Sequence, residues 1–584
     1  MVAAKKADFN RWAREFGITP VLARILRNRG LLEEAEIRTF LKGTLSDCYS
    51  PWLMKDMDKA VEELVHAITD KVKIRVIGDY DVDGICASYI LTRGLQHLGG
   101  NVDTAIPHRI HDGYGLNDHL IETAAEDGVK MILTCDNGIA AASQIELAAQ
   151  LGITVIITDH HEVPYEILAD GEKRERLPAA RAVVDPKRAD CPYPFKGICG
   201  GVVAYKLMQA LTEELEKPHQ EWMEEFLEFA AFATVCDVME LLDENRIIVK
   251  EGLQKMRRSR NLGLKALMEV NGLNPDHLSA HHLGFVLGPC LNATGRLDTA
   301  RRALELLQSE SKGEAMCAAR ELKDLNDSRK SLTLEGVEKA RTYIETHSME
   351  KDKVLVIYLP EVHESLAGII AGRIREIYSH PVFVLTRGED GVKGSGRSIE
   401  SYHMYQEMTK VKDLFTKYGG HKLAAGLSMD EENVSILRER LNQNCTLTEK
   451  DFIPVVHIDV PMPVSYTSLE LARELEVLEP FGVGNPKPLF AQKDLLFIGE
   501  TRMGREGSFA RFRVKTPQGD MEQMILFRGL EQFEQGYLEK YGAAALENLL
   551  AGKGSYPVAV TYQLGINSFR GQTDKQLIIQ NFQF

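Results

Sequence analysis

Short apolar runs alternate with amphipathic stretches through residues 71–185, and this alternation predicts an α/β domain. The apolar runs have strand length and are rich in β-branched residues. They cover residues 74–78, 102–106, 131–135, 154–158 and 182–185. The stretches between them have helical periodicity and cover residues 87–98, 116–127 and 141–151. Because strands that alternate with helices form a parallel sheet covered on both faces, we predict a parallel, doubly wound domain.

The pattern changes along the chain and predicts five parts. Residues 1–70 look helical, and we expect them to pack on the core. The doubly wound domain spans 71–310, and the charged, proline-free segment 311–350 predicts a connecting helix. Residues 351–448 predict a second, smaller α/β domain. Short β-rich runs separated by Gly and Pro fill 449–584 and predict a β-rich domain.

Composition narrows the class of protein. The chain is 44% hydrophobic and 27% charged, as in ordinary globular proteins, and we find neither a bilayer-spanning run nor a signal peptide. The nine cysteines form no CxxC pair, so we expect reduced thiols, a cytoplasmic location and no membrane. The net charge of −15 argues against indiscriminate binding to nucleic acid, although local basic clusters remain able to bind it.

An acidic turn follows the first predicted strand. Asp79, Asp81 and Asp83 lie within five residues, just before Gly84. Three like charges repel one another unless a cation or hydrogen-bond donors neutralise them. Taken alone, a solvated acidic turn is the better interpretation.

Other elements of the same domain end in similar groups. The groups after the strands at 131–135 and 154–158 and after a helix at 222–235 are Asp136, Asp159, His160, His161 and Asp237. The carboxyl ends of parallel strands gather at one edge of a sheet, where such domains bind ligands. Carboxylates favour Mg²⁺ or Mn²⁺, and added imidazole shifts the preference toward Mn²⁺. The sequence therefore predicts a site for two metal ions.

Four short motifs, in their order along the chain, support this interpretation. GDYDVDG (78–84), CDNG (135–138), TDHH (158–161) and TVCDVMEL (234–241) resemble the four motifs of the DHH phosphoesterases. Four later motifs look like the RecJ subgroup of that family. They are NATGRLD (292–298), GSGRS (394–398), GGHKLAAG (419–426) and EPFGVGNPKPLF (479–490).

The resemblance implies roles for the strand-end residues. It implies that the metal ligands are Asp81, Asp83, Asp136, His160 and Asp237, with Asp79 as a further ligand or a supporting acid. Asp136 would bridge both ions, and His161 would contact the scissile phosphate or help the leaving group. Asp159 would orient a histidine, and a helix N-cap is an equally good explanation of it.

Substrate contacts are also implied by the resemblance. They are Arg109, Tyr114 and Arg296 in the first domain and Ser395, Arg397, Gly419, Gly420 and His421 on loops of the second. Relatives usually have a basic residue near position 290, where this chain has Cys290, which weakens one expected phosphate contact.

The β-rich domain contains an alternating strand, FARFRVK at 509–515. Arg511 and Arg513 fall on one face of it, and Phe512 and Val514 fall on the other. A half-buried strand explains this alternation without any function. The resemblance favours an OB-fold whose basic face, with Phe509, binds a single strand of DNA.

The activity implied by the resemblance is 5′-to-3′ exonuclease action on single-stranded DNA in repair and recombination, with two Mn²⁺ or Mg²⁺ ions. A single-strand-binding protein and a helicase are possible partners. A phosphodiesterase acting on short oligonucleotides or cyclic dinucleotides is the alternative activity. From another class, a nuclease-like binding scaffold generally loses metal ligands, whereas every expected ligand is present here.

Overall fold

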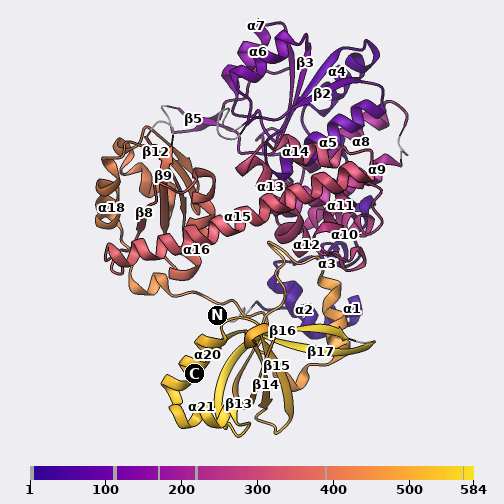
Figure 1. Cartoon of the computed structure of the whole chain (residues 1–584). Coiled ribbons are helices and arrows are strands. Elements are labelled where there is room, and N and C mark those ends of the chain that lie inside the picture. The colour runs from indigo at the N-terminus through magenta and orange to yellow at the C-terminus, as the bar shows by residue number, and fades with distance from the viewer. Residues whose placement is uncertain (1–4, 109–114, 169–170, 218–220, 389–390, 570) are drawn as a thin grey trace.

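A computed structural model describes residues 5–108, 115–168, 171–217, 221–388, 391–569 and 571–584. One long helix runs between two α/β domains, and a barrel lies below the first of them in the view of Figure 1. Among the described residues, no helix is both long and apolar enough to cross a membrane.

The first domain is built on a sheet of five parallel strands in the order β2-β1-β3-β4-β7. The strands are β1 (Lys73–Ile77), β2 (Asn101–Ala105), β3 (Met131–Cys135), β4 (Thr154–Thr158) and β7 (Ala182–Val184). The helices around it are α4 (Met57–Thr69), α5 (Val82–His97), α6 (Asp118–Glu126), α7 (Ala142–Gln150), α8 (Gly200–Glu214) and α9 (Trp222–Cys236).

Alternate strand residues point to opposite faces of this sheet, and each face is covered by helices. Val76 and Leu133 pack with α4, α5, α8 and α9, whereas Ile77 and Ile132 pack with α6 and α7. The predicted parallel, doubly wound domain is therefore confirmed. Strands β5 (Tyr165–Ile167) and β6 (Lys173–Glu175) pair with each other, outside this sheet.

A helical layer follows and leads into the long helix. It contains α10 (Asp243–Met256), α11 (Leu262–Val270), α12 (Ala280–His282), the π-helix η4 (Leu283–Leu287), α13 (Gly288–Leu297) and α14 (Arg301–Leu307). The connecting helix is α15 (Lys312–Thr346). It contributes Ala315, Ala319 and Leu322 to the first core and Val337 and Ala340 to the second, so both domains are packed on one continuous helix.

The second α/β domain has a mixed sheet in the order β11-β12-β10-β9-β8. Its strands are β8 (Leu355–Tyr358), β9 (Val382–Gly388), β10 (Gly391–Arg397), β11 (Lys417–Gly420) and β12 (Ala424–Met429). Its helices are α16 (Ala367–Tyr378), α17 (Met404–Thr409) and α18 (Asn433–Asn444). Only β8 and β9 pair in parallel, and the other pairs are antiparallel.

Two glycine-rich motifs of this domain lie in strands, so our prediction that they lie on loops was wrong. Ser395 and Arg397 are in β10, and Gly419 and Gly420 are in β11. The reason is close packing, because a Cβ atom at Gly396 would lie 2.4 Å from the sulfur of Met404. Glycine is therefore used in β10 to admit a neighbouring side chain.

The C-terminal domain is a closed barrel in the order β13-β14-β15-β17-β16. Its strands are β13 (Phe490–Met503), β14 (Phe509–Lys515), β15 (Met521–Leu526), β16 (Tyr556–Phe569) and β17 (Gln572–Gln583). Helices α19 (Leu469–Leu475), α20 (Leu530–Tyr541) and α21 (Ala543–Leu550) pack beside it. The predicted OB-like fold is confirmed.

The N-terminal segment does not pack as one unit. The early helices are α1 (Phe9–Phe16), α2 (Pro20–Asn28) and α3 (Glu34–Lys42). Leu22, Ile25 and Phe40 join the hydrophobic core of the barrel, whereas Met57 and Leu64 of α4 join the core of the first domain. The N-terminal segment therefore packs on both the first domain and the C-terminal barrel (Figure 1).

Candidate metal centre

The acidic turn 79–83 lies between β1 and α5, at the carboxyl end of the parallel sheet. The helix begins at Val82, five residues earlier than the helical stretch we expected at 87–98, because Asp81 caps it by accepting hydrogen bonds from the amides of Asp83 and Gly84. Asp83 therefore lies inside the first helical turn and is buried.

Asp83 is held by the start of another helix. Its two carboxylate oxygens accept hydrogen bonds of 2.7 Å from the amides of Gly200 and Gly201 in α8. A Cβ atom at Gly200 would lie 2.7 Å from Cβ of Asp136, so glycine is required for this approach. The sequence reasoning missed this pair, and the only signal was two adjacent glycines before a helical stretch.

Asp136 follows β3 in a left-handed conformation, with φ of 60°. Its amide donates to the carbonyl of Thr158, and the side chain of Asn137 donates to the carbonyls of Ile77 and Cys135. These bonds to both neighbouring strands hold the turn and direct the Asp136 carboxylate into the site.

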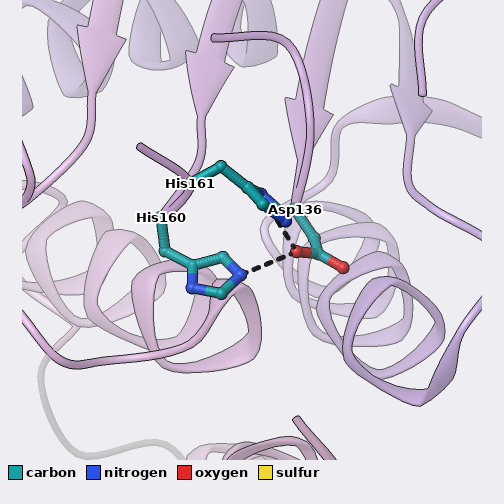
Figure 2. Close-up of side chains that lie close together, drawn as sticks. All are labelled: Asp136, His160 and His161. Atoms are coloured by element: carbon teal, nitrogen blue, oxygen red, sulfur yellow. Dashed lines mark hydrogen bonds and ion pairs between the residues drawn. The ribbon is translucent and has the colours of Figure 1, made fainter. Parts of the chain in front are cut away.

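His160 is the centre of the cluster. Its Nε2 lies 3.0 Å from Asp136 Oδ1, 3.4 Å from Asp83 Oδ2 and 3.7 Å from Asp237 Oδ2. Figure 2 shows His160 and His161 both directed toward the Asp136 carboxylate. Groups from β1, β3, β4 and α9 thus converge on one point.

In each of three sets of residues, the ligand atoms lie within 4.8 Å of one another. The sets are Asp136, His160 and His161; Asp83, His160 and Asp237; and Asp79, Asp81 and Asp136. All six predicted ligands belong to these sets, and Asp79, the least certain of them, is included. The sets share Asp136 and His160, as adjacent ions would require.

The carboxylates repel one another strongly without a cation. Burial and the charges of Asp83, Asp81 and Asp79 raise the pKa of Asp136 well above its ordinary value. Burial and the charges of Asp83 and Asp81 raise the pKa of Asp237 to about 8. A divalent cation would neutralise this charge, and the oxygen-rich donor set with one or two imidazoles fits Mn²⁺ or Mg²⁺.

Asp159 contacts the histidine beside it. Its Oδ1 lies 2.7 Å from Nδ1 of His161, and its Oδ2 accepts a hydrogen bond from the amide of Ile139. Burial lowers the pKa of His161, but the hydrogen bond and the charges of Asp159 and Asp237 outweigh burial and raise this pKa to about 9. Asp159 also accepts from the amides of His160 and His161, but no helix begins at residues 159–161, and its role in orienting His161 stays a prediction.

Asp185 is a further acid that the sequence reasoning did not select. It directly follows β7 and is fully buried, and burial and the charge of Asp159 raise its pKa to about 7. The signal was present, because the strand at 182–185 ends in an acid like its neighbours.

Only some of the predicted substrate residues that the structure describes line a common cavity. Arg109 and Tyr114 lie outside the described residues. A cavity of about 500 Å³ lies between the acidic turn and the second domain, and Tyr80, Ser365, Ser395 and Gly419 line it. His421 is exposed and does not line this cavity.

Two arginines converge on the start of α16, next to the cavity. Arg296 Nη1 donates to the carbonyl of Ser365 at 2.7 Å, across the two α/β domains. Arg397 Nη1 donates to Ser395 Oγ at 3.1 Å, and a Cβ atom at Gly368 would lie 2.9 Å from Arg397 Nη2. Both guanidinium groups therefore lie at the seam that the cavity occupies.

Cys290 is buried between helices. Its sulfur lies 3.5 Å from Nδ2 of Asn326 on α15 and 3.3 Å from the carbonyl of Val286. The thiol is part of the helix packing, and position 290 supplies no cation.

The alternation in β14 has the predicted orientation. Phe512 and Val514 are fully buried, whereas Arg511 and Arg513 are exposed. Arg513 Nη2 also donates to the carbonyl of Gly552 at 3.2 Å. Both arginines line a surface cavity of about 340 Å³ on the barrel.

Comparisons with known proteins agree with this architecture. Residues 73–234 match the DHH family N-terminal domain, residues 351–446 the DHHA1 domain, and residues 458–581 the RecJ OB domain.

Relatives match over nearly the whole chain. The single-stranded-DNA-specific exonuclease RecJ of Bacillus subtilis is 33% identical over 97% of this chain and 68% of its own length. The protein of the same name from Escherichia coli is 34% identical over 97% of this chain and 96% of its own length. The crystal structure of RecJ in complex with Mn²⁺ from Thermus thermophilus is 28% identical, with a TM-score of 0.80 over 100% of this chain and 79% of that chain. The chain therefore belongs to the RecJ family of DHH proteins.

Proposed function

We propose that this chain is a metal-dependent exonuclease specific for single-stranded DNA, releasing 5′-mononucleotides in the 5′-to-3′ direction during DNA repair and recombination. One observation carries the proposal. The carboxylates and imidazoles at three strand ends and one helix end form three overlapping sets, the ligand atoms of each set lying within 4.8 Å of one another, in a chain that matches RecJ exonucleases over nearly its full length.

In this proposal the ions are held by Asp79, Asp81, Asp83, Asp136, His160 and Asp237. When bound, two such ions activate a water for attack on phosphorus and neutralise charge on the leaving oxygen. His161 lies beside Asp136 and is held by Asp159, so it is suited to contact a phosphate oxygen or the leaving group. Asp159 holds the His161 ring in place.

The cavity at the seam of the two α/β domains would hold the terminal nucleotide opposite the ions. Arg296, Arg397 and the glycines of β11 are our candidates for its phosphate contacts. The basic face of β14 would bind the strand further along.

The decisive experiment compares end-labelled single-stranded DNA, duplex DNA and a dinucleotide, each with Mn²⁺ and with chelator. Release of labelled 5′-mononucleotide from single strands, abolished by chelator, is the expected result. Preference for the dinucleotide would overturn the proposal in favour of the oligonucleotide phosphodiesterase. Binding without cleavage would identify a scaffold.

Arg397→Ala tests the substrate cavity. We expect KM for single-stranded DNA to rise about tenfold while Mn²⁺ affinity is unchanged, because Arg397 lies beside the cavity and outside the ligand sets. Arg341→Ala on the exposed side of α15 is the matched control. Unchanged KM would remove Arg397 from the site.

Partners and location extend the proposal. We propose that a helicase and a single-strand-binding protein supply the substrate, because a single-strand-specific enzyme needs the duplex opened. Pull-down with each partner in the presence of nuclease tests this idea. A cytoplasmic location is supported by nine cysteines that are all free thiols, and fractionation tests it.

A further inference from the structure

A second large cavity lies on the first α/β domain, at the start of α9 and the ends of α5 and α10. Its volume is about 960 Å³, enough for a small organic ligand. Trp222, the first residue of α9, lines this cavity, whereas Asp237 follows the last residue of the same helix. The 15-residue helix spans roughly 20 Å, so the cavity is distinct from the metal centre.

A buried carboxyl group lines the cavity. Glu228 is only 4% exposed, and its Oε2 has no hydrogen-bond partner in the described part of the chain. Burial raises the pKa of Glu228 to about 7. Its neighbour Glu225 is already bound, by the hydroxyl of Tyr89 and the amide of Asn261. Because buried polar atoms normally have a partner, the unpaired Oε2 of Glu228 at the cavity wall is our candidate to accept a hydrogen bond from a ligand.

Some charges around the cavity neutralise one another. Lys255 Nζ lies 2.9 Å from Glu224 Oε1, and Arg260 Nη1 lies 2.8 Å from Glu221 Oε2. These two pairs contribute little net charge to the cavity.

Three guanidinium groups have no such close partner. Among the described residues, Arg257 and Arg258 have no carboxylate oxygen within 4.0 Å, and the nearest one to Arg93 belongs to Glu310 at 3.8 Å. The cavity lining carries five basic and five acidic side chains, so its formal charges balance, and these three guanidinium groups are the lining cations without a close carboxylate in the described part of the chain. Guanidinium groups match phosphate oxygens in geometry as well as charge.

One wall of the cavity is aromatic. The rings of Trp222 and His97 are nearly parallel, with 12° between their planes and 5.2 Å between their centroids. His97 is exposed, so its outer surface is open to a further flat ring. Stacking on aromatic side chains is a common way for proteins to hold a nucleobase.

We propose that this cavity binds a nucleoside phosphate. The base would stack on the His97–Trp222 pair and donate an N–H to Glu228. The phosphates would be held by Arg93, Arg257 and Arg258. The three features identify this class together, since an anion alone needs neither the aromatic wall nor the buried carboxyl group. The proposal does not depend on the nuclease activity.

Calorimetry on the full chain tests the proposed nucleotide binding, with GTP, ATP and inorganic pyrophosphate as probes. EDTA is present so that metal-bridged binding is excluded. We expect at least one of the two nucleotides to bind tenfold or more tightly than pyrophosphate and to change Trp222 fluorescence. Trp222→Phe should remove that signal, leaving the emission of Trp12 and Trp52 unaffected by the probe.

Three variants locate the site. Arg257→Ala with Arg258→Ala should weaken nucleotide binding at least tenfold, and both side chains are exposed, so the fold should be retained. Glu228→Gln, of the same size, should weaken nucleotide binding several-fold without changing pyrophosphate binding. Arg397→Ala, at the other cavity, should leave nucleotide binding unchanged.

Any of three outcomes would overturn the proposal. One is no nucleotide binding up to about 1 mM. Another is equal affinity for pyrophosphate and both nucleotides, which would indicate an anion patch only. The third is binding lost in Arg397→Ala but kept in the Arg257/Arg258 variant, which would place the nucleotide at the seam beside the metal centre.

Discussion

Asp136 is the residue on which the metal centre depends most. It belongs to two of the three ligand sets, and its Oδ1 contacts the imidazole of His160. Its left-handed turn is held by hydrogen bonds to β1 and β4 rather than by the carboxylate itself. The side chain can therefore be changed without removing what holds the backbone.

Asp136→Asn should lower kcat on single-stranded DNA by at least roughly 10²–10³-fold, because the proposed metal site would lose a charged ligand. Release of labelled mononucleotide measures this loss, and circular dichroism should show an unchanged fold. Asp118→Asn, an exposed acid at the start of α6, is the matched control. A folded variant with near-normal turnover would remove Asp136 from the ligands.

The affinity for Mn²⁺ should rise with pH between 6 and 8. The pKa of Asp237 is raised to about 8 by burial and by Asp83 and Asp81, so below pH 8 a proton occupies the carboxyl group and must leave when the ion binds. Each released proton makes affinity about tenfold higher per pH unit, and this dependence ends above the folded pKa.

Calorimetric Mn²⁺ titrations at pH 6, 7 and 8 measure this dependence. Asp237→Asn carries no titratable proton at that position and should show a smaller slope. A Mn²⁺ affinity that does not vary across this range would contradict proton release from the site.

At the scale of elements, the turn between β1 and α5 is built on a close backbone contact. A Cβ atom at Gly84 would lie 2.4 Å from the carbonyl oxygen of Asp79 and 2.5 Å from its amide nitrogen. The turn carries Asp79, Asp81 and Asp83, so glycine at position 84 sets the position of three ligands without being one.

Gly84→Ala should lower Mn²⁺ affinity at least about tenfold and the free energy of unfolding by about 1–3 kcal/mol, since the added methyl group must displace backbone. Calorimetry and chemical denaturation measure the two effects. Gly313→Ala in α15 has open space around it and should be neutral or slightly stabilising. If Gly84→Ala bound Mn²⁺ normally, the turn would be less constrained than the contact implies.

At the scale of the whole molecule, Arg246 of α10 joins the first domain to both ends of the chain. It is 2% exposed, and its guanidinium group donates to the carbonyls of Phe40 in α3 and of Val477, Leu478 and Glu479 ahead of the barrel. Burial lowers the pKa of Arg246 to about 10, which still leaves it charged at neutral pH.

Arg246→Met should loosen the barrel from the first domain. The buried carbonyls of Phe40 and Leu478 and the part-buried ones of Val477 and Glu479 would lose their donor, at a cost of about 3 kcal/mol. We expect KM for long single strands to rise while dinucleotide hydrolysis is unchanged, with faster proteolysis ahead of the barrel. Arg341→Ala controls for loss of an exposed arginine. Equal effects on long and short substrates would argue against this role.

Much of the first domain could be predicted because its signals are local. Strand-length apolar runs followed by acids imply one carboxylate-rich edge wherever strands run in parallel, and the structure places Asp79 and Asp136 there. The same logic applied to the strand at 182–185 would have found Asp185. The boundaries between the five parts of the chain and the roles of the site residues stay predictions.

Residue spacing was enough to predict a parallel sheet, the acids at its edge and the two faces of β14, because these features depend on the pattern along one strand or helix. The contacts between segments that are distant in the sequence could be seen only in the tertiary structure. It placed α2 and α3 on the barrel, held Asp83 with two amides of α8, and put Ser395 and Gly419 opposite Tyr80 across one cavity. These contacts join segments more than 100 residues apart, and no local periodicity encodes which surfaces meet.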